Sequence, residues 1–369
     1  MLLGVLAGMG VLSDRLQSRD DAVGSVAASL QAAGLNLEAR EEQAAGYYEG
    51  LLNEGARVSR MNPRLGSGAE VPLWGIGSPE RRSRDDFLVY DMNPNVHLEG
   101  ALPLLTNSEG LADKEYSRAR RPGVRRIALI GDSIARGQGA PPGRSFEARL
   151  EEDLALHAPC PGPPPEIINF AVSGYQITQL LDVLPTRARA FNPDVYAIAL
   201  TEISVSRRWS DHLTTIIRQG RDPKYPFLEK VIRESRVSPT DPQRTMRAKL
   251  SRFRFDVFRE VITQMKQLAA EDHANLVLLL VPSGRAIREV RENFAGVPEL
   301  LRSLDVNVVN LLRTFAHVPD VSVVRVSDAD IHPNAAGHAL LFKALRGAVD
   351  APDGRVRTLL LGDSCRERS

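Results

Sequence analysis

The sequence is poor in cysteine, with Cys160 and Cys365 as the two examples in a chain of 369 residues. Two cysteines are too few for the disulfide framework of small secreted domains, or for a zinc site built from cysteine clusters. We interpret them as unrelated thiols, because Cys160 lies in a proline-rich stretch and Cys365 stands four residues from the C-terminal end of the sequence. A disulfide between them is the alternative in an oxidising compartment.

Net charge is also scarce. Lys and Arg number 47 and Asp and Glu number 46, which leaves a formal net charge of +1 at pH 7. This balance gives no electrostatic basis for binding DNA or RNA, so we expect no nucleic-acid partner. Hydrophobic residues at 43% and charged residues at 25% are ordinary for globular proteins and exclude a chain that is disordered throughout.

Long hydrophobic runs are absent, since no segment reaches the ~18–20 apolar residues that a helix needs to span a bilayer. The nearest segment is Met1–Leu12, which is apolar and uncharged but too short and without a basic start. It is either the end of an anchor or signal that begins upstream, or a helix that packs on the domain. Membrane association through the N-terminus is therefore one of two open expectations.

Motifs for nucleotides and metals are missing as well. The sequence has no G-x-x-x-x-G-K-[ST], no G-x-G-x-x-G after a strand and no H-E-x-x-H. Neither a phosphate-cradling loop nor zinc chemistry is supported without such motifs. We therefore expect no cofactor and no metal ion.

Composition divides the chain into four parts. Residues 1–56 are mostly rich in Ala, Leu, Glu and Gln, which predicts a helical N-terminal segment. Residues 57–122 contain many prolines and predict an irregular lead-in of loops and short strands. Residues 123–349 carry the main domain, which includes an arginine-rich insertion at 207–249, and residues 350–369 are expected to form a frayed tail.

The main domain alternates apolar runs with helical patterns. The runs are short, rich in β-branched residues and bounded by turn residues, as is typical of strands buried on both faces. They lie at 125–133, 166–174, 194–202, 274–283 and 306–312. Helical patterns such as Ser145–Leu156, Gln176–Ala190 and Phe253–Ala270 fill the intervals. Alternating strands and helices predict right-handed crossovers and a parallel sheet, so the expected fold class is three-layer α/β.

A serine follows the first apolar run, in the stretch IGDS at 130–133. Parallel sheets place their ligands at the carboxyl ends of the strands, where Ser133 is expected to lie. Gly131 allows a tight turn, and the backbone N–H after such a turn is free to face a developing oxyanion. The letters GDS recur at 362–364, but five residues follow Ser364, too few for a partner loop, and we interpret that copy as a decoy.

A histidine loop, DADIHPNAAGH, stands far along the chain at 328–338. His332 precedes a proline that can open a helix, and Asp330 and Asp328 stand two and four residues before it. A serine hydroxyl needs a base to attack at neutral pH, and the base needs a carboxylate that orients it. The loop supplies both groups, so we expect the sheet to bring it next to Ser133.

Three features of the sequence together resemble the SGNH (GDSL-type) hydrolase superfamily. They are the stretch IGDS at 130–133, the pair Ser173-Gly174 and the histidine loop at 328–338. The resemblance covers roughly residues 124–349 and implies a flavodoxin-like domain with a parallel five-stranded sheet. Upstream, the stretch TNSEGLADKE at 106–115 resembles the lead-in of a bacterial subgroup with an N-terminal extension. Members of that subgroup often carry an N-terminal membrane anchor.

Carried over residue by residue, the resemblance implies that Ser133 is the nucleophile and His332 the base. It also implies an oxyanion hole made by the N–H of Ser133, the N–H of Gly174 and a third donor. The third donor of the family is an asparagine side chain, and its position is held here by Thr201. We expect the Thr201 hydroxyl to donate instead, although losing an oxyanion donor typically costs about 10²–10³-fold in kcat.

The acidic residue is a second departure from the family pattern. The usual aspartate stands three residues before the histidine, and that position is Ala329 in this chain. Asp330 is our first choice for the orienting acid, because one residue of loop slack can restore the hydrogen bond, and Asp328 is the second choice.

The resemblance implies a serine esterase that hydrolyses O-acyl esters of a carbohydrate or a lipid-like substrate through an acyl-enzyme. An O-acyltransferase acting on a surface polysaccharide would use the same residues. The rival class is a non-catalytic binding or scaffold protein with this fold, which the altered aspartate spacing and the missing asparagine favour. The expected location is the cell envelope, membrane-associated or periplasmic, with the cytoplasm as the alternative.

Overall fold

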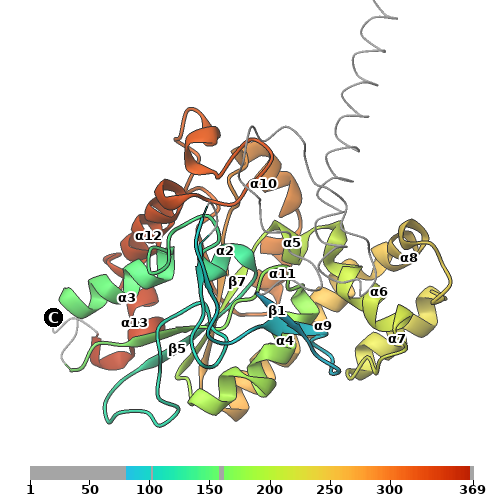
Figure 1. Ribbon diagram of the computed structural model, residues 1–369, viewed down its shortest axis with the longest axis horizontal. Coiled ribbons are helices and arrows are strands. Elements are labelled where there is room, and N and C mark those ends of the chain that lie inside the picture. The colour runs from blue at the N-terminus through green and yellow to red at the C-terminus, as the bar shows by residue number, and fades with distance from the viewer. Residues whose placement is uncertain (1–79, 101–102, 158–161, 366–369) are drawn as a thin grey trace, which may run out of the picture.

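The computed structural model describes residues 80–100, 103–157 and 162–365, and its centre is a parallel sheet (Figure 1). The strands are β5 (Arg126–Ile130), β6 (Glu166–Asn169), β7 (Val195–Leu200), β8 (Asn275–Leu280) and β9 (Asn307–Asn310). Their order across the sheet is β6-β5-β7-β8-β9, and every neighbouring pair is parallel. This is the 2-1-3-4-5 order of flavodoxin-like folds, so the expected fold class is confirmed.

The central strands β5 and β7 are buried on both faces, which explains why they read as continuous apolar runs in the sequence. Every residue of β5 and β7 is buried. Along β5, Ile127 and Leu129 face one hydrophobic cluster, while Ala128 and Ile130 face the other. The alternation of side chains along a strand thus supplies the core on both sides of the sheet.

Helices cover both faces and make the three layers (Figure 1). One face is covered by α3 (Phe146–Leu156), α12 (Ala335–Val349) and α13 (Arg355–Leu361). The other is covered mainly by α4 (Ile177–Thr186), α9 (Arg254–Glu271) and α11 (Val297–Ser303). The remaining helices are α2 (Ser133–Arg136), α5 (Glu202–Val205), α6 (Asp211–Arg218), α7 (Pro226–Ser235), α8 (Gln243–Leu250) and α10 (Ile287–Asn293). Short 3-10 helices are η1 (Ala188–Phe191), η2 (Arg207–Ser210), η3 (Ser251–Phe253), η4 (Val321–Val324) and η5 (Asp363–Cys365).

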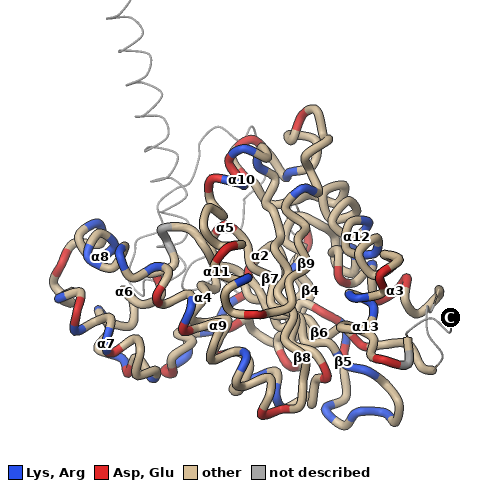
Figure 2. The backbone as a smooth tube through the Cα atoms, turned by 180° about the vertical axis from the view of Figure 1, so that it is seen from behind, with Lys and Arg blue, Asp and Glu red and all other residues tan. Residues whose placement is uncertain are grey.

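The arginine-rich insertion at 207–249 folds into η2, α6, α7 and most of α8, to one side of the sheet in Figure 1. Its apolar side chains join the same hydrophobic cluster as α4 and α9. Arginine in the insertion is partly neutralised, since the buried Asp211 accepts from Arg247 Nε at 2.6 Å. Figure 2 shows Lys and Arg interspersed with Asp and Glu along the chain, in keeping with a net charge of +1.

The C-terminal part of the chain is more ordered than expected. The expectation of a frayed tail from residue 350 is wrong for residues 355–365, which form α13 and η5. Leu360 and Leu361 are buried in the cluster that α3 and α12 also line. The Arg125 guanidinium donates to the carbonyl of Leu360 at 2.7 Å, which satisfies an end of α13.

The lead-in is described from residue 80 onward, while the predicted helical segment 1–56 lies outside the described residues. The lead-in contributes two antiparallel strand pairs, β1 (Arg81–Ser83) with β2 (Tyr90–Met92), and β3 (His97–Leu98) with β4 (Leu104–Leu105). The buried Asp91 of β2 accepts from Arg187 Nη1 at 2.6 Å. This ion pair and the buried apolar residues of 87–92 join the lead-in to the core beside α4.

His212 also holds the lead-in, and it gives a testable pH dependence. Its Nε2 donates to Phe87 O at 2.7 Å and its Nδ1 accepts from Thr178 Oγ1 at 2.8 Å, which fixes the neutral ring. Burial lowers the pKa of His212 to about 4. Since the folded pKa lies below the unfolded value of about 6.5, its contribution to stability is complete above pH 6.5 and declines as pH falls toward 4.

We therefore expect wild type to lose about 2 kcal/mol more unfolding free energy than His212→Gln when pH falls from 7 to 4.5. Glutamine can make both hydrogen bonds but cannot titrate. Urea unfolding of the two proteins at both pH values measures the difference. Equal losses in the two proteins would contradict a depressed His212 pKa.

Two expectations concern the chain termini. Cys365 is buried and disulfide-bonded, so the interpretation as unrelated thiols is wrong, while Cys160 itself lies outside the described residues.

Within residues 80–365, as far as they are described, no helix has both the length and the hydrophobicity of a membrane span. The segment Met1–Leu12 lies outside that part of the chain.

Candidate active site

Ser133 begins α2 directly after β5 and so lies at the carboxyl edge of the sheet. Asp132 caps this short helix, because its Oδ1 accepts from the N–H of Ile134 at 3.0 Å. An aspartate before the serine therefore has a local structural role: it fixes the turn from strand to helix. Ser133 itself is 0% exposed.

The histidine loop is held as a small hairpin in front of α12. Arg325 and Pro333 form an isolated antiparallel bridge, and Val326 N–H donates to His332 O at 2.9 Å. Asn334 ties the loop together, since its Nδ2 donates to Arg325 O at 2.9 Å and its Oδ1 accepts from two N–H groups at the start of α12. One asparagine side chain thus both caps the helix and closes the loop.

Gly139 lets this loop approach the serine segment closely. A Cβ at Gly139 would lie 2.3 Å from Pro333 O and 2.8 Å from Val326 Cγ2, and its φ is +95°. No residue with a side chain fits such a contact in this backbone region. The close approach brings His332 to Ser133 from a distant part of the sequence.

The side chains of Ser133, His332 and Asp330 form a continuous hydrogen-bonded chain. His332 Nε2 lies 2.7 Å from Ser133 Oγ, and His332 Nδ1 is hydrogen-bonded to Asp330 Oδ1. Asp330 Oδ1 also accepts from the backbone N–H of His332 at 3.0 Å. A neutral histidine with its proton on Nδ1 donates to Asp330 and accepts the serine hydroxyl proton at Nε2.

Asp330 is ionised at neutral pH in this setting. Burial raises the pKa of its carboxyl, but the His332 ring charge and the hydrogen bonds from the His332 ring and backbone outweigh burial, and the net pKa is lowered. Asp328, the second choice for the acid, lies elsewhere: its side chain is 88% exposed and is paired with Arg325. The two-residue spacing of Asp330 therefore suffices, and the structure does not bring Asp328 to His332.

Two backbone N–H groups at the site are unengaged. Within the described residues, neither Ser133 N–H nor Gly174 N–H donates a hydrogen bond. Gly174 sits in a turn that is closed by Tyr175 N–H donating to Val172 O at 3.2 Å, and its φ is +79°. A positive φ at the third residue of such a turn is the geometry that type II turns reserve for glycine.

The expectation for Thr201 is wrong. Its hydroxyl donates its one proton to Asp132 Oδ2, so it is not available to an oxyanion. Burial raises the pKa of Asp132, and the hydrogen bonds from Thr201 and Ile134 oppose that rise. Thr201 thus braces the capping aspartate of the serine turn, and the third donor of the family pattern has no counterpart there.

The comparison with known families agrees with this geometry. The model of the GDSL-like lipase/acylhydrolase family matches residues 129–340, which is more than half of the chain and spans both Ser133 and His332. The chain belongs to this family. It is accordingly an ester hydrolase of the GDSL type.

Three similar proteins share 16–22% of their residues with this GDSL hydrolase. YpmR of Bacillus subtilis (strain 168), an uncharacterized protein, is 22% identical over 262 residues, which cover 68% of this chain and 91% of YpmR. Among solved structures, TesA is 16% identical with a TM-score of 0.39, covering 61% of this chain and 98% of TesA. The acetylxylan esterase Axe2 from Geobacillus stearothermophilus is 16% identical with a TM-score of 0.41, covering 62% of this chain and 95% of Axe2.

Sequence reasoning missed Gln138 of this GDSL hydrolase. Its Oε1 accepts from Arg136 Nη2 at 2.9 Å and from Ser173 Oγ at 3.1 Å, and its Nε2 lies 3.4 Å from His332 Nδ1. One carboxamide thus touches the serine helix, the Gly174 turn and the histidine ring. The sequence shows only that Gln138 follows the GDS motif closely. A sequence pattern does not show which partners a long side chain reaches.

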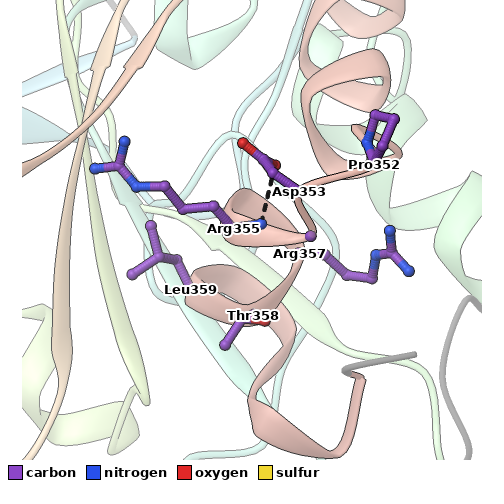
Figure 3. Close-up of a pocket in the computed structure, with 7 residues that line it drawn as sticks. Pro352, Asp353, Arg355, Arg357, Thr358 and Leu359 are labelled. Carbon is purple, nitrogen blue, oxygen red and sulfur yellow. Dashed lines mark hydrogen bonds between the residues drawn. The ribbon is translucent and has the colours of Figure 1, made fainter. Parts of the chain in front are cut away.

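We searched the described residues for a second site, in a surface cavity away from Ser133 and among side chains that could ligate a metal ion, and found none. A surface cavity of about 580 Å³ lies along α13, lined by residues that include Asp353, Arg355 and Thr358 (Figure 3). Leu359 at this cavity accepts from Asn275 at the start of β8, so the cavity lies at the amino edge of the sheet, opposite Ser133. Among the described residues, no group of three or more His, Cys, Asp or Glu side chains is arranged to hold a metal ion.

Proposed function

We propose that this GDSL hydrolase cleaves O-acyl esters through an acyl-enzyme on Ser133. Ser133 Oγ attacks the ester carbonyl carbon while His332 Nε2 takes the hydroxyl proton, and Asp330 stabilises the imidazolium. The tetrahedral oxyanion accepts from the N–H groups of Ser133 and Gly174. The intermediate collapses to the acyl-serine, and His332 returns the proton to the departing alkoxide. Water then attacks the acyl-serine by the same steps.

The observation that carries this proposal is the hydrogen-bonded chain from Asp330 through His332 to Ser133. Each link is within hydrogen-bond reach, with 2.7 Å between His332 Nε2 and Ser133 Oγ. A serine in a merely structural turn has no need of a base that is itself oriented by an ionised carboxylate. The aspartate spacing, which favoured a scaffold protein from the sequence, therefore argues no longer against catalysis.

For the substrate we propose a short O-acyl group on a carbohydrate, with a longer lipid-like ester as the second candidate. Ser133 is 0% and His332 6% exposed, which favours an acyl group small enough for an enclosed site. Because a hydrophobic pocket gains or loses about 10-fold or more per misfitting methylene, kcat/KM is expected to fall from p-nitrophenyl acetate through butyrate to octanoate. A rise toward octanoate would instead support a lipid-like ester.

A fluorophosphonate probe tests the mechanism separately from the substrate. The probe reacts with activated serines, so we expect covalent labelling of wild type and, after proteolysis, a modified peptide that contains Ser133. The second GDS copy at 362–364 serves as the internal control and should stay unmodified. A silent probe together with no ester hydrolysis would overturn catalysis and favour the scaffold class.

An O-acyltransferase uses the same acyl-serine but a sugar hydroxyl in place of water. The loss of the third oxyanion donor at Thr201 predicts slow turnover with water as acceptor, which a better-placed alcohol would relieve. Adding xylose or chitooligosaccharides to the p-nitrophenyl acetate assay tests this, since an acyltransferase releases p-nitrophenol faster and yields acetylated sugar. An unchanged rate and free acetate identify a hydrolase.

We further propose that the protein works in the cell envelope. The disulfide of Cys365 supports an oxidising compartment, since such bonds persist outside the reducing cytosol. The apolar segment Met1–Leu12 supports a membrane-proximal N-terminus. Fractionation of the native host, with alkylation of thiols before lysis, should find the protein in the envelope fraction with unmodified cysteines; alkylated cysteines in the soluble fraction would support the cytoplasm.

A further inference from the structure

A tyrosine of the lead-in reaches the turn that contains Gly174. Tyr90, on β2, donates its hydroxyl to the carbonyl of Ser173 at 2.8 Å, and the side chain is 0% exposed. The two residues are 83 positions apart in the sequence. In the described chain this is therefore a tertiary contact between the lead-in and the edge of the sheet where Ser133 lies.

The contacted carbonyl belongs to the peptide group whose N–H is the proposed oxyanion donor. The carbonyl of Ser173 and the N–H of Gly174 are the two ends of one planar unit. Holding the oxygen of that unit therefore fixes the direction in which its N–H points. The N–H itself makes no hydrogen bond within the described residues, so it is free to donate to an oxyanion.

This peptide group needs an external hold, because a turn with glycine at its third residue can flip. Type I and type II turns differ mainly by rotation of the central peptide, and Gly174, with φ +79°, tolerates both arrangements. A flip would reverse the direction of the Gly174 N–H and turn it away from the oxyanion to which the proposed function assigns it. The hydrogen bond from Tyr90 opposes the flip directly, since it exists in one arrangement and is lost in the other.

We propose that Tyr90 is a positioning residue of the active site: it locks the Ser173–Gly174 peptide so that the Gly174 N–H faces the oxyanion. The inference rests on the proposed function and extends it into the lead-in. A donor on the carbonyl also polarises the peptide and strengthens the N–H as a donor, because hydrogen bonds in a chain reinforce one another. The lead-in is then a part of the catalytic unit.

Tyr90 is itself held from several sides. Tyr175 donates its hydroxyl to Tyr90 O at 2.7 Å, and the two rings meet edge to face with centroids 5.2 Å apart. The Arg81 guanidinium lies 3.8 Å from the centroid of the Tyr90 ring. A side chain restrained in this way loses little entropy when it holds the turn.

Tyr90→Phe removes the hydroxyl and keeps the ring. We expect kcat for p-nitrophenyl acetate to fall about 10-fold, which is less than the 10²–10³-fold cost of deleting an oxyanion donor outright. KM should stay within 2-fold, because the ground-state carbonyl does not depend on the oriented N–H. Binding of phenylboronic acid, which forms a tetrahedral adduct on the serine, should weaken by the same factor as kcat.

Tyr196→Phe is the matched control. It removes another hydroxyl hydrogen bond of a buried tyrosine, from Tyr196 to Asp272 Oδ2 at 2.6 Å, near the start of β7 and not at the Ser173–Gly174 peptide. We expect similar falls in thermal unfolding midpoint for both variants, with kcat and boronate affinity preserved in Tyr196→Phe. Unchanged kcat in Tyr90→Phe, or equal losses of kcat in both variants, would overturn the inference. An inactive wild type that binds no boronate would instead overturn the proposed function on which it rests.

Discussion

Ser133→Ala is expected to lower kcat/KM for p-nitrophenyl acetate by roughly 10⁴–10⁶-fold, the loss seen when the nucleophile of a triad is removed. Alanine lacks the oxygen that would form the acyl-enzyme, and His332 Nε2 then has no hydroxyl to deprotonate. Purified wild type and variant are compared by p-nitrophenol release, with circular dichroism to verify folding. The residual rate reports what the two backbone N–H groups do without a nucleophile.

Ser364→Ala is the control that the chain itself provides. It changes the same three-letter motif at 362–364, which follows α13 at the amino edge of the sheet, since Leu360 near the end of α13 accepts from Arg125 directly before β5. Its activity should match that of wild type. Loss of activity in Ser364→Ala with retention in Ser133→Ala would reverse the assignment of nucleophile and decoy.

Much of the fold could be predicted because its signals are local. The apolar runs at 194–202 and 274–283 contain β7 and β8, and the pattern Ser145–Leu156 contains α3. Strands buried on both faces read as short, continuous apolar runs, and their length and β-branched content separate them from buried helices. The tail was predicted wrongly because α13 has no strong local pattern of its own; its order comes from burial of Leu360 and Leu361 against the sheet and from Arg125.

The candidate site divides in the same way. Ser133, His332 and Asp330 could be proposed because each stands in a recognisable segment, and the parallel sheet dictates which segments meet. Thr201 was misjudged because the sequence shows that a hydroxyl is present but not which acceptor takes its proton; the neighbouring Asp132 takes it. Tyr90 could not be found at all, since its partner carbonyl is 83 positions away and carries no side-chain signal.

Asp330→Asn is expected to lower kcat by about 10⁴-fold with little change in KM, as loss of the orienting carboxylate does in serine hydrolases. The reason lies in the proton on the ring. Asp330 accepts from His332 Nδ1, which leaves Nε2 as the acceptor that faces Ser133 at 2.7 Å. An asparagine amide can donate to Nδ1, which would place the ring proton on Nε2, where it blocks removal of the serine proton.

Asp328→Asn tests whether activity depends on the carboxylate that orients His332 or on any carboxylate of the loop. Its exposed side chain pairs with Arg325, and exposed ion pairs contribute about 1 kcal/mol or less, so kcat should remain within 2-fold of wild type. If Asp328→Asn were the damaging change and Asp330→Asn the harmless one, the loop would have to rearrange before catalysis. In a loop rearranged in this way, Asp330 Oδ1 would no longer accept from the His332 N–H. The comparison therefore tests, together with the triad, that the acid stands two residues before the histidine.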